Sequence, residues 1–145
     1  MKGQNFGLMK ELVPYVISGR KYVTSRVATE FRRKLVIGGR MNFFTGLRTP
    51  NCKRFGTGIV KDKIYWWIKQ LPARHIIRES SILNESPLKD MDWKKFSYIE
   101  GFEEYNDFYH YFTNHPKRDL IDKVGLILFV FDFSIERLKQ KELML

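Results

Sequence analysis

The spacing of hydrophobic residues predicts a short helix near the N-terminus and a strand directly after it. Apolar side chains recur at helical intervals over residues 12–17, and Ser18-Gly19 ends the pattern. Pro14 is compatible with the first turn of such a helix. Residues 22–24 are aromatic and β-branched, which favours a short strand. Residues 27–34 are polar and basic, and we expect them to form an exposed connection.

The following third of the chain has the pattern of strands joined by turns. Residues 35–37 favour a strand or the entry to one, and residues 40–45 predict a second strand. Glycine, threonine, proline and asparagine gather in residues 46–58, which predicts a basic hairpin or a long loop. The alternating residues 59–68 predict a further strand with a break near Asp62-Lys63.

Two helices and a central strand are predicted in the second half. Residues 93–101 predict a short helix that ends at a glycine, and aromatic residues at three- and four-residue intervals over 102–112 predict an amphipathic helix. The continuous apolar run 126–133 is typical of a central strand. Residues 74–90 have no pattern that assigns them to an element, and residues 134–145 read as a helical C-terminal extension.

This order of elements predicts one α+β domain spanning residues 1–145, with its core in about residues 5–133. The strands dominate the first half, and the last strand must return to them. A small, mostly antiparallel β-barrel with helices flanking its openings satisfies that order. The hydrophobic fraction of 43% supports a globular chain with a core, not a disordered one.

The distribution of charge is the feature of the sequence that most strongly indicates a function. The formal net charge is +10, and the segment from Ser18 to Lys63 holds 12 basic and 2 acidic residues, so it carries the whole excess. The rest of the chain has 14 residues of each sign and is neutral. Such segregation favours a face that binds a polyanion, because each neutralised phosphate releases counterions. We therefore expect the basic side chains to converge on one groove that binds RNA or another nucleic acid.

Several segments resemble the ASCH domain, a branch of the PUA-like barrels. That family has a short helix leading into a Gly-x-Lys-x-x-Thr-x-Arg segment, which matches Gly19–Arg26. The Gly38-Gly39 turn, the Glu100–Phe102 element with its following helix, and the strand at 126–133 also fall in the family's order. The resemblance covers most of residues 5–133. The chain departs from the family at Gly39, where Asp is usual, and in the long stretch 74–90.

The resemblance implies a PUA-like fold and association with RNA. Some members of this family are nucleases, and others are amidohydrolases that deacetylate N4-acetylcytidine with a lysine, a threonine and a glutamate. By motif these three residues fall on Lys21, Thr24 and Glu100. The resemblance therefore implies, as an alternative to simple binding, a hydrolase acting on RNA or on a modified nucleoside.

The residues themselves leave that chemistry open. A threonine hydroxyl becomes a nucleophile when a base takes its proton; a desolvated Lys21 could be that base for Thr24, and Glu100 could hold the lysine. On a regular strand, however, Lys21 and Thr24 would face opposite sides, so they converge only across a turn or bulge. In the alternative interpretation, Lys21 and Arg26 contact phosphate, Thr24 favours the strand, and Glu100 pairs with a basic group.

Two basic clusters are candidates for contact with nucleic acid. The first is Arg32-Arg33-Lys34, whose alternative is a solvated loop that binds nothing. The second lies in the 46–58 loop, where Phe44 and Phe55 either stack on bases or pack into the core; for Phe44 the core is favoured. The predicted nucleic-acid-binding residues are Lys21, Arg26, Arg32, Arg33, Arg40, Arg48, Lys53 and Arg54.

Other classes of function have little support. Cys52 is the single cysteine, so an intramolecular disulfide is excluded, and the three histidines lack metal-ligand spacing. We expect no metal and no cofactor. The longest apolar run, 126–131, is far shorter than the ~20 residues of a membrane span, so a soluble cytoplasmic protein is expected. A domain that docks on an acidic protein partner remains an alternative, and the oligomeric state is left open.

Overall fold

The computed structural model describes residues 3–69, 75–81 and 93–135, which form a mixed α+β fold around one six-stranded sheet. In chain order the elements are β1 (Gln4–Leu8), the 3-10 helix η1 (Lys10–Leu12), α1 (Val13–Ile17), β2 (Val23–Val27), α2 (Glu30–Arg33), β3 (Arg40–Thr45), β4 (Lys53–Lys69), β5 (His75–Ser81), α3 (Trp93–Glu100), α4 (Tyr105–Thr113), α5 (Arg118–Val124) and β6 (Leu126–Ile135). Within these elements, no helix is long and apolar enough to cross a membrane.

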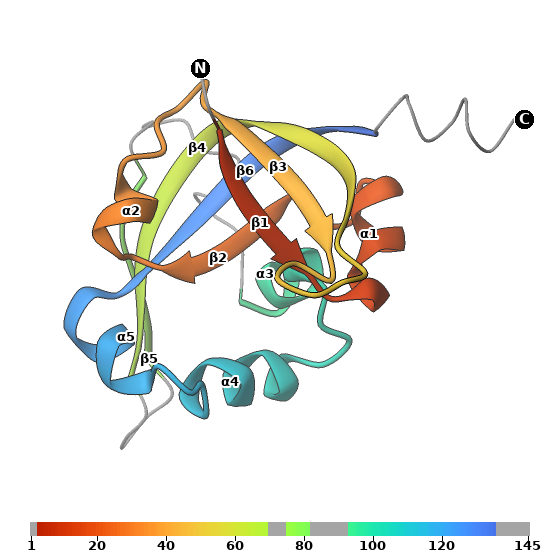
Figure 1. Ribbon diagram of the computed structural model, residues 1–145. Coiled ribbons are helices and arrows are strands. Elements are labelled where there is room, and N and C mark those ends of the chain that lie inside the picture. The colour runs from red at the N-terminus through yellow and green to blue at the C-terminus, as the bar shows by residue number, and fades with distance from the viewer. Residues whose placement is uncertain (1–2, 70–74, 82–92, 136–145) are drawn as a thin grey trace, which may run out of the picture.

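The sheet is curled and mostly antiparallel. Its strands follow the order β1-β3-β4-β6-β2, and β5 pairs with the C-terminal part of β4. Every pairing is antiparallel except that of β1 with β3. The curl brings β1 and β2, the two ends of this path, to the same side of the molecule in front of β4 and β6 (Figure 1). These two edges frame the site described below.

Two apolar clusters cover the two faces of the sheet. The concave face packs phenylalanines of four strands against α1, and its largest members are Phe6, Met41, Phe43, Phe129 and Phe131. The other face packs against the helices; there the fully buried Trp66 ring stacks on Phe108 at 5.7 Å between centroids and meets Phe112 edge-on. The aromatic stripe of residues 102–112 is therefore largely core, as its helical spacing predicted.

The elements with a strong local pattern are confirmed. α1, β3, α3, α4 and β6 all lie where the sequence predicted them. The long strand β4 contains the predicted break, because its register against β6 shifts between Val60 and Asp62. Such a β-bulge bends the strand and helps the sheet to curl.

The predicted strand at 35–37 is wrong, whereas the hairpin alternative for residues 46–58 is confirmed, because β3 and β4 pair antiparallel across this segment. Residues 35–37 form no strand; the Gly38 and Gly39 backbones bond to that of Val60 instead. The strand β4 begins earlier than expected, at Lys53, within the predicted loop. Gly56 lies within this strand, and a Cβ at this position would collide with the Phe133 ring. The glycine is therefore needed for close packing and does not mark a turn.

Besides η1 and β5, three elements were not predicted. The first is β1, and the second is α2, which lies inside the predicted basic connection and is capped by the Thr29 hydroxyl accepting from the Arg32 amide at 3.3 Å. The third is α5. The unassigned stretch 74–90 contains β5, and the rest of it lies outside the described residues. Ser134 belongs to β6, and the expected terminal helix after it falls outside the described residues.

Candidate functional site

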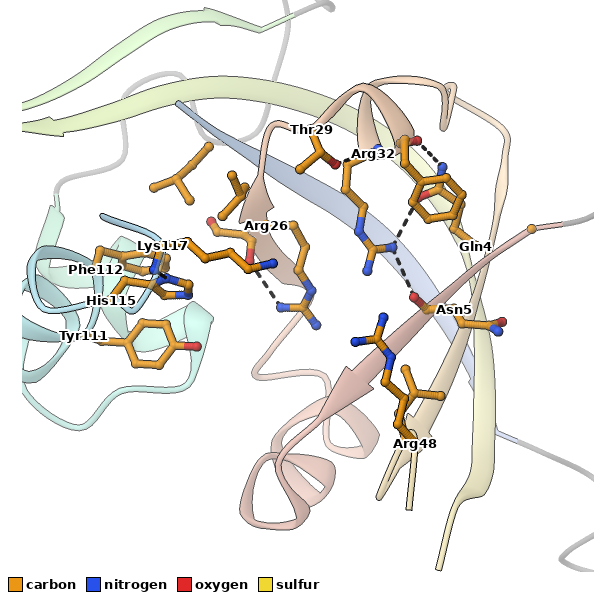
Figure 2. Close-up of a pocket in the computed structure, with 16 residues that line it drawn as sticks. Gln4, Asn5, Arg26, Thr29, Arg32, Arg48, Tyr111, Phe112, His115 and Lys117 are labelled. Carbon is orange, nitrogen blue, oxygen red and sulfur yellow. Dashed lines mark hydrogen bonds between the residues drawn. The ribbon is translucent and has the colours of Figure 1, made fainter. Parts of the chain in front are cut away.

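A pocket of about 710 Å³ opens between the two edge strands β1 and β2. Its other walls are α2, the loop between β3 and β4, and the end of α4 with the loop that follows (Figure 2). In the described residues, β1 and β2 are the two ends of the sheet and do not pair with each other. The polar and charged side chains that line the pocket are Gln4, Asn5, Ser25, Arg26, Thr29, Arg32, Arg48, Tyr111, His115 and Lys117.

Three arginines from three different elements point into this space (Figure 2). Arg26 leaves β2, and its Nη2 donates to the Gly7 carbonyl of β1 at 2.8 Å, so it bridges the two edges. Arg32 leaves α2, and its Nη1 donates to the Gln4 Oε1 at 3.2 Å and to a carbonyl of β1 at 3.1 Å. Arg48 lies in the β3–β4 loop with a left-handed backbone, φ 68°. The first two guanidinium groups are therefore held in fixed directions.

None of these arginines forms an ion pair within the described residues, although the Glu100 carboxylate attracts Arg26 electrostatically. In the part of the chain that the structure describes, no carboxylate oxygen lies within 4.0 Å of Arg26, Arg32 or Arg48, whereas Arg20 and Arg118 both have such a partner. Burial, together with the charges of Arg26 and Arg48, lowers the pKa of Arg32 to about 10. A guanidinium that loses water and gains only like charges favours an anion beside it.

The opposite wall combines a cation, an imidazole and aromatic rings. Tyr111 is 47% exposed and touches His115 edge-on, with 5.7 Å between ring centroids. Burial lowers the pKa of His115, and the neighbouring Lys117 charge adds to this effect. Phe112 lines the inner wall, and Phe31, 59% exposed, lines the pocket from α2. The pocket thus offers flat apolar surfaces near its charged groups.

A buried ion pair lies behind the pocket. The Lys21 Nζ donates to the Glu100 backbone carbonyl at 2.5 Å and lies 3.4 Å from its Oε2. The side chains are 2% and 5% exposed. Burial lowers the pKa of Lys21, and the Glu100 carboxylate opposes part of that effect. Two predicted candidate residues that are far apart in sequence, Lys21 and Glu100, are therefore in contact.

Ser25 connects this pair to the pocket. Its Oγ donates to the Glu100 Oε1 at 2.6 Å and accepts from the Trp66 indole at 3.1 Å, and the residue also lines the pocket. The strand alternation gives this place to Ser25 and not to Thr24. The Thr24 hydroxyl is buried, and within the described ranges it has no hydrogen-bond partner. The structure thus brings Lys21 and Glu100 together, but it forms no hydrogen bond from Thr24 to either.

The predicted nucleic-acid-binding residues converge only in part. Arg26, Arg32 and Arg48 line the pocket, while Lys21 is buried behind it. Arg33 donates its Nε to the Ala28 carbonyl at 2.9 Å, outside the lining. The remaining predicted residues, which also lie outside the lining, are Arg40, Lys53 and Arg54. Of the two phenylalanines in question, Phe55 is buried in the core and Phe44 is half-buried.

Sequence reasoning missed the residues of the opposite wall and of β1. Tyr111, His115 and Lys117 come from the neutral half of the chain, so the charge distribution did not point to them. One signal was present: Tyr111 lies off the apolar stripe of its helix, where an aromatic side chain is directed toward solvent. Asn5 had no comparable signal, because the strand that carries it was not predicted.

Comparison with known proteins gives the fold and no function. No protein-family model and no curated protein matches the chain. The crystal structure of hypothetical protein PH0355 is similar, with a TM-score of 0.57 and 15% identity over 90% of this chain and 97% of that one. The solution NMR structure of protein PF0455 from Pyrococcus furiosus has a TM-score of 0.54 and 13% identity over 91% of this chain and 97% of that one. At these identities the likeness concerns the fold alone.

Proposed function

We propose that this protein binds nucleic acid, and RNA in the first instance, through the pocket between β1 and β2. The observation that carries the proposal is the set of three arginines, Arg26, Arg32 and Arg48, that meet in one pocket without a carboxylate within 4.0 Å among the described residues. Phosphate is the common biological anion that matches guanidinium geometry with paired hydrogen bonds. Lys117 adds a fourth cation on the facing wall.

The shape and lining of the pocket support a nucleotide as the bound unit. The volume of about 710 Å³ falls in the range of small-molecule sites, which is roughly 300–1,000 Å³. The half-exposed ring of Tyr111 and the exposed ring of Phe31 offer faces on which an unpaired base can stack. Such stacking contributes about 1–3 kcal/mol per base. Unpaired bases are more accessible in RNA loops and single strands than in a duplex, which favours those ligands.

We further propose that the fold is a PUA-like barrel and that the chain is an ASCH-type domain. The support is the Gly19–Arg26 motif at the entry to β2, the Glu100–Phe102 element before α4, and the curled sheet with helices at its ends. The motif also supplies two of the groups discussed here, since Arg26 lines the pocket and Lys21 forms the buried pair. Association with RNA is what the resemblance implies, and it agrees with the arginine-lined pocket.

The test is the binding of a short fluorescent single-stranded RNA, followed by anisotropy, to the wild type, Arg48→Glu and Arg40→Glu. Both arginines are exposed and carry the same charge, but Arg48 lines the pocket and Arg40 does not. A hydrogen bond to a charged group is worth about 1.5–3 kcal/mol, so Arg48→Glu should weaken binding at least about tenfold. Arg40→Glu should weaken it much less. Equal losses in the two variants, or no binding by the wild type at low salt, would reject the proposal.

A hydrolase acting on RNA or a modified nucleoside is the second candidate function. The observation that favours it is the contact of Lys21 with Glu100, joined through Ser25 to the lining of the pocket. A carboxylate that is held in place and shielded from water can serve as a general acid or base. The unpartnered Thr24 hydroxyl is the nucleophile that the family resemblance implies.

The hydrolase is tested by incubating the protein with N4-acetylcytidine and measuring released acetate. Glu100→Gln and Thr24→Val should each abolish turnover while the circular dichroism spectrum stays unchanged. Arg40→Glu, which alters a residue outside the pocket lining and outside the buried pair, should keep full activity. Lack of turnover by the wild type on this substrate and on RNA would reject the candidate.

A further inference from the structure

The three pocket arginines carry more charge than one internal phosphate of a nucleic acid can balance. A phosphodiester inside a strand has a single negative charge, whereas a terminal phosphate monoester has about −1.5 to −2 at pH 7. Arg26, Arg32 and Arg48 together present three positive charges, with no carboxylate within 4.0 Å among the residues described. Burial first, and then repulsion by Arg26 and Arg48, lowers the pKa of Arg32. A dianion relieves that repulsion more fully than a monoanion does.

The hydrogen-bond donors of the arginines lead to the same conclusion. Arg32 uses only its Nη1 for hydrogen bonds, so its Nε–Nη2 edge has no hydrogen-bond partner in the described part of the chain. Arg26 uses one hydrogen bond from each Nη and keeps its Nε. Arg48 forms no side-chain hydrogen bond within the described residues. An Nε–Nη2 edge matches two oxygens of one phosphate, and a terminal phosphate has three such oxygens against two in a diester.

Two of the three groups are also oriented before any ligand arrives. Arg26 is anchored to the Gly7 carbonyl, and Arg32 to Gln4 and the neighbouring backbone of β1. The Arg32 guanidinium also lies 4.1 Å from the Phe6 ring centroid, within the range of a cation–π contact. Groups that are already oriented lose little conformational entropy on binding, so their interactions appear more fully in the affinity. The exposed Arg48 lines the pocket from the β3–β4 loop.

We propose that the pocket recognises the phosphate monoester at the end of a nucleic-acid strand in preference to internal phosphates. The proposal rests on the proposed function, since it names the part of the nucleic acid that the pocket takes. The terminal phosphate lies among the three arginines, and the adjoining base lies toward Tyr111 or Phe31. A free mononucleotide carries the same monoester, and the experiment distinguishes the two sources.

The experiment compares short single-stranded RNAs of one sequence that carry a 5′-phosphate, a 3′-phosphate or only hydroxyl ends. Binding is measured by anisotropy at one salt concentration, and AMP and adenosine are measured by calorimetry. One of the phosphorylated RNAs should bind about tenfold or more tightly than the hydroxyl form, as expected for one added charge-assisted contact. Its advantage should grow between about pH 5 and 7, because the monoester gains its second charge near pKa 6.

Two variants test whether the preference for a terminal phosphate depends on the pocket. Arg48→Gln should reduce the ratio of affinities for phosphorylated and hydroxyl RNA toward one, whereas Arg40→Gln should leave that ratio unchanged. If all three RNAs bind equally and Arg48→Gln weakens them equally, the proposed function stands and the preference for a terminal phosphate is wrong. If AMP binds and no RNA does, the monoester belongs to a free nucleotide and the strand-end proposal is wrong. If nothing binds, both proposals fail.

Discussion

Breaking the buried pair of Lys21 and Glu100 should cost more stability than breaking the exposed pair of Lys61 and Asp132. Replacing Glu100 with Gln keeps the shape of the side chain and an acceptor for the Ser25 hydroxyl. It removes the carboxylate beside the Lys21 ammonium, which then keeps only the residue-100 carbonyl at 2.5 Å. The variant thus tests charge compensation with little change in packing.

The expected loss of folding stability in Glu100→Gln follows from the burial of the pair. The Lys21 and Glu100 side chains are 2% and 5% exposed, so an unpaired Lys21 cannot recover its lost hydration. Removing one partner of a buried pair costs about 3–5 kcal/mol, and we expect Glu100→Gln to fall in that range. The matched control is Asp132→Asn, because Asp132 pairs with Lys61 at 3.0 Å with side chains 69% and 57% exposed. Exposed pairs contribute only about 0–1 kcal/mol.

The assay is urea unfolding at neutral pH, followed by tryptophan fluorescence, for the wild type, both variants and the double variant Lys21→Met/Glu100→Gln. The double variant should be more stable than Glu100→Gln alone, because it removes the buried uncompensated charge. An unchanged m-value would show that the compactness of the two states is preserved. A loss for Glu100→Gln as small as that for Asp132→Asn would refute the assignment of a charged, buried pair.

Three further predictions concern the pocket and the sheet. With an RNA that carries a terminal phosphate, neutralisation of its roughly two charges predicts a slope of about −1.4 for log affinity against log salt, and Arg48→Gln should reduce the size of this slope by about 0.7; titrations between about 50 and 200 mM salt measure both. Burial, and to a smaller extent the Lys117 charge, lowers the pKa of His115, so its imidazole gains charge at lower pH than an ordinary histidine and binding of RNA with hydroxyl ends should strengthen on acidification. His115→Ala should flatten that pH profile, and an unchanged profile would show that another group is responsible. Gly56→Ala should destabilise the fold by about 1–3 kcal/mol in urea unfolding, because its Cβ meets the Phe133 ring, and a neutral effect would mean that this ring moves aside easily.

The sequence predicted the elements whose signal is local. The aromatic stripe of α4, the apolar run of β6 and the alternation in β3 each specify an element within a few residues, and all three were confirmed. β1 has only five residues, with Gly7 among them, and its parallel pairing with β3 depends on residues more than thirty positions away. A pattern confined to five residues does not reveal such a partner.

The site was less predictable than the fold, because it depends on the directions of side chains. The charge distribution located the pocket arginines Arg26, Arg32 and Arg48, but it also included Arg40 and Lys53, which lie outside the lining. Both groups belong to the same basic segment, so only the three-dimensional path of the chain separates them. Likewise, strand alternation turns Ser25 and not Thr24 toward Glu100, a choice that depends on where β2 begins.

The central claim is that Arg26, Arg32 and Arg48 act together as one anion site. The most direct measurement is an NMR titration of ¹⁵N-labelled protein with a short single-stranded RNA, following the arginine Nε–Hε signals. The three signals should shift together and saturate with one dissociation constant, while the Arg40 signal stays in place. Shifts confined to Arg40 and other arginines outside the pocket, or separate dissociation constants for the three pocket residues, would contradict the account.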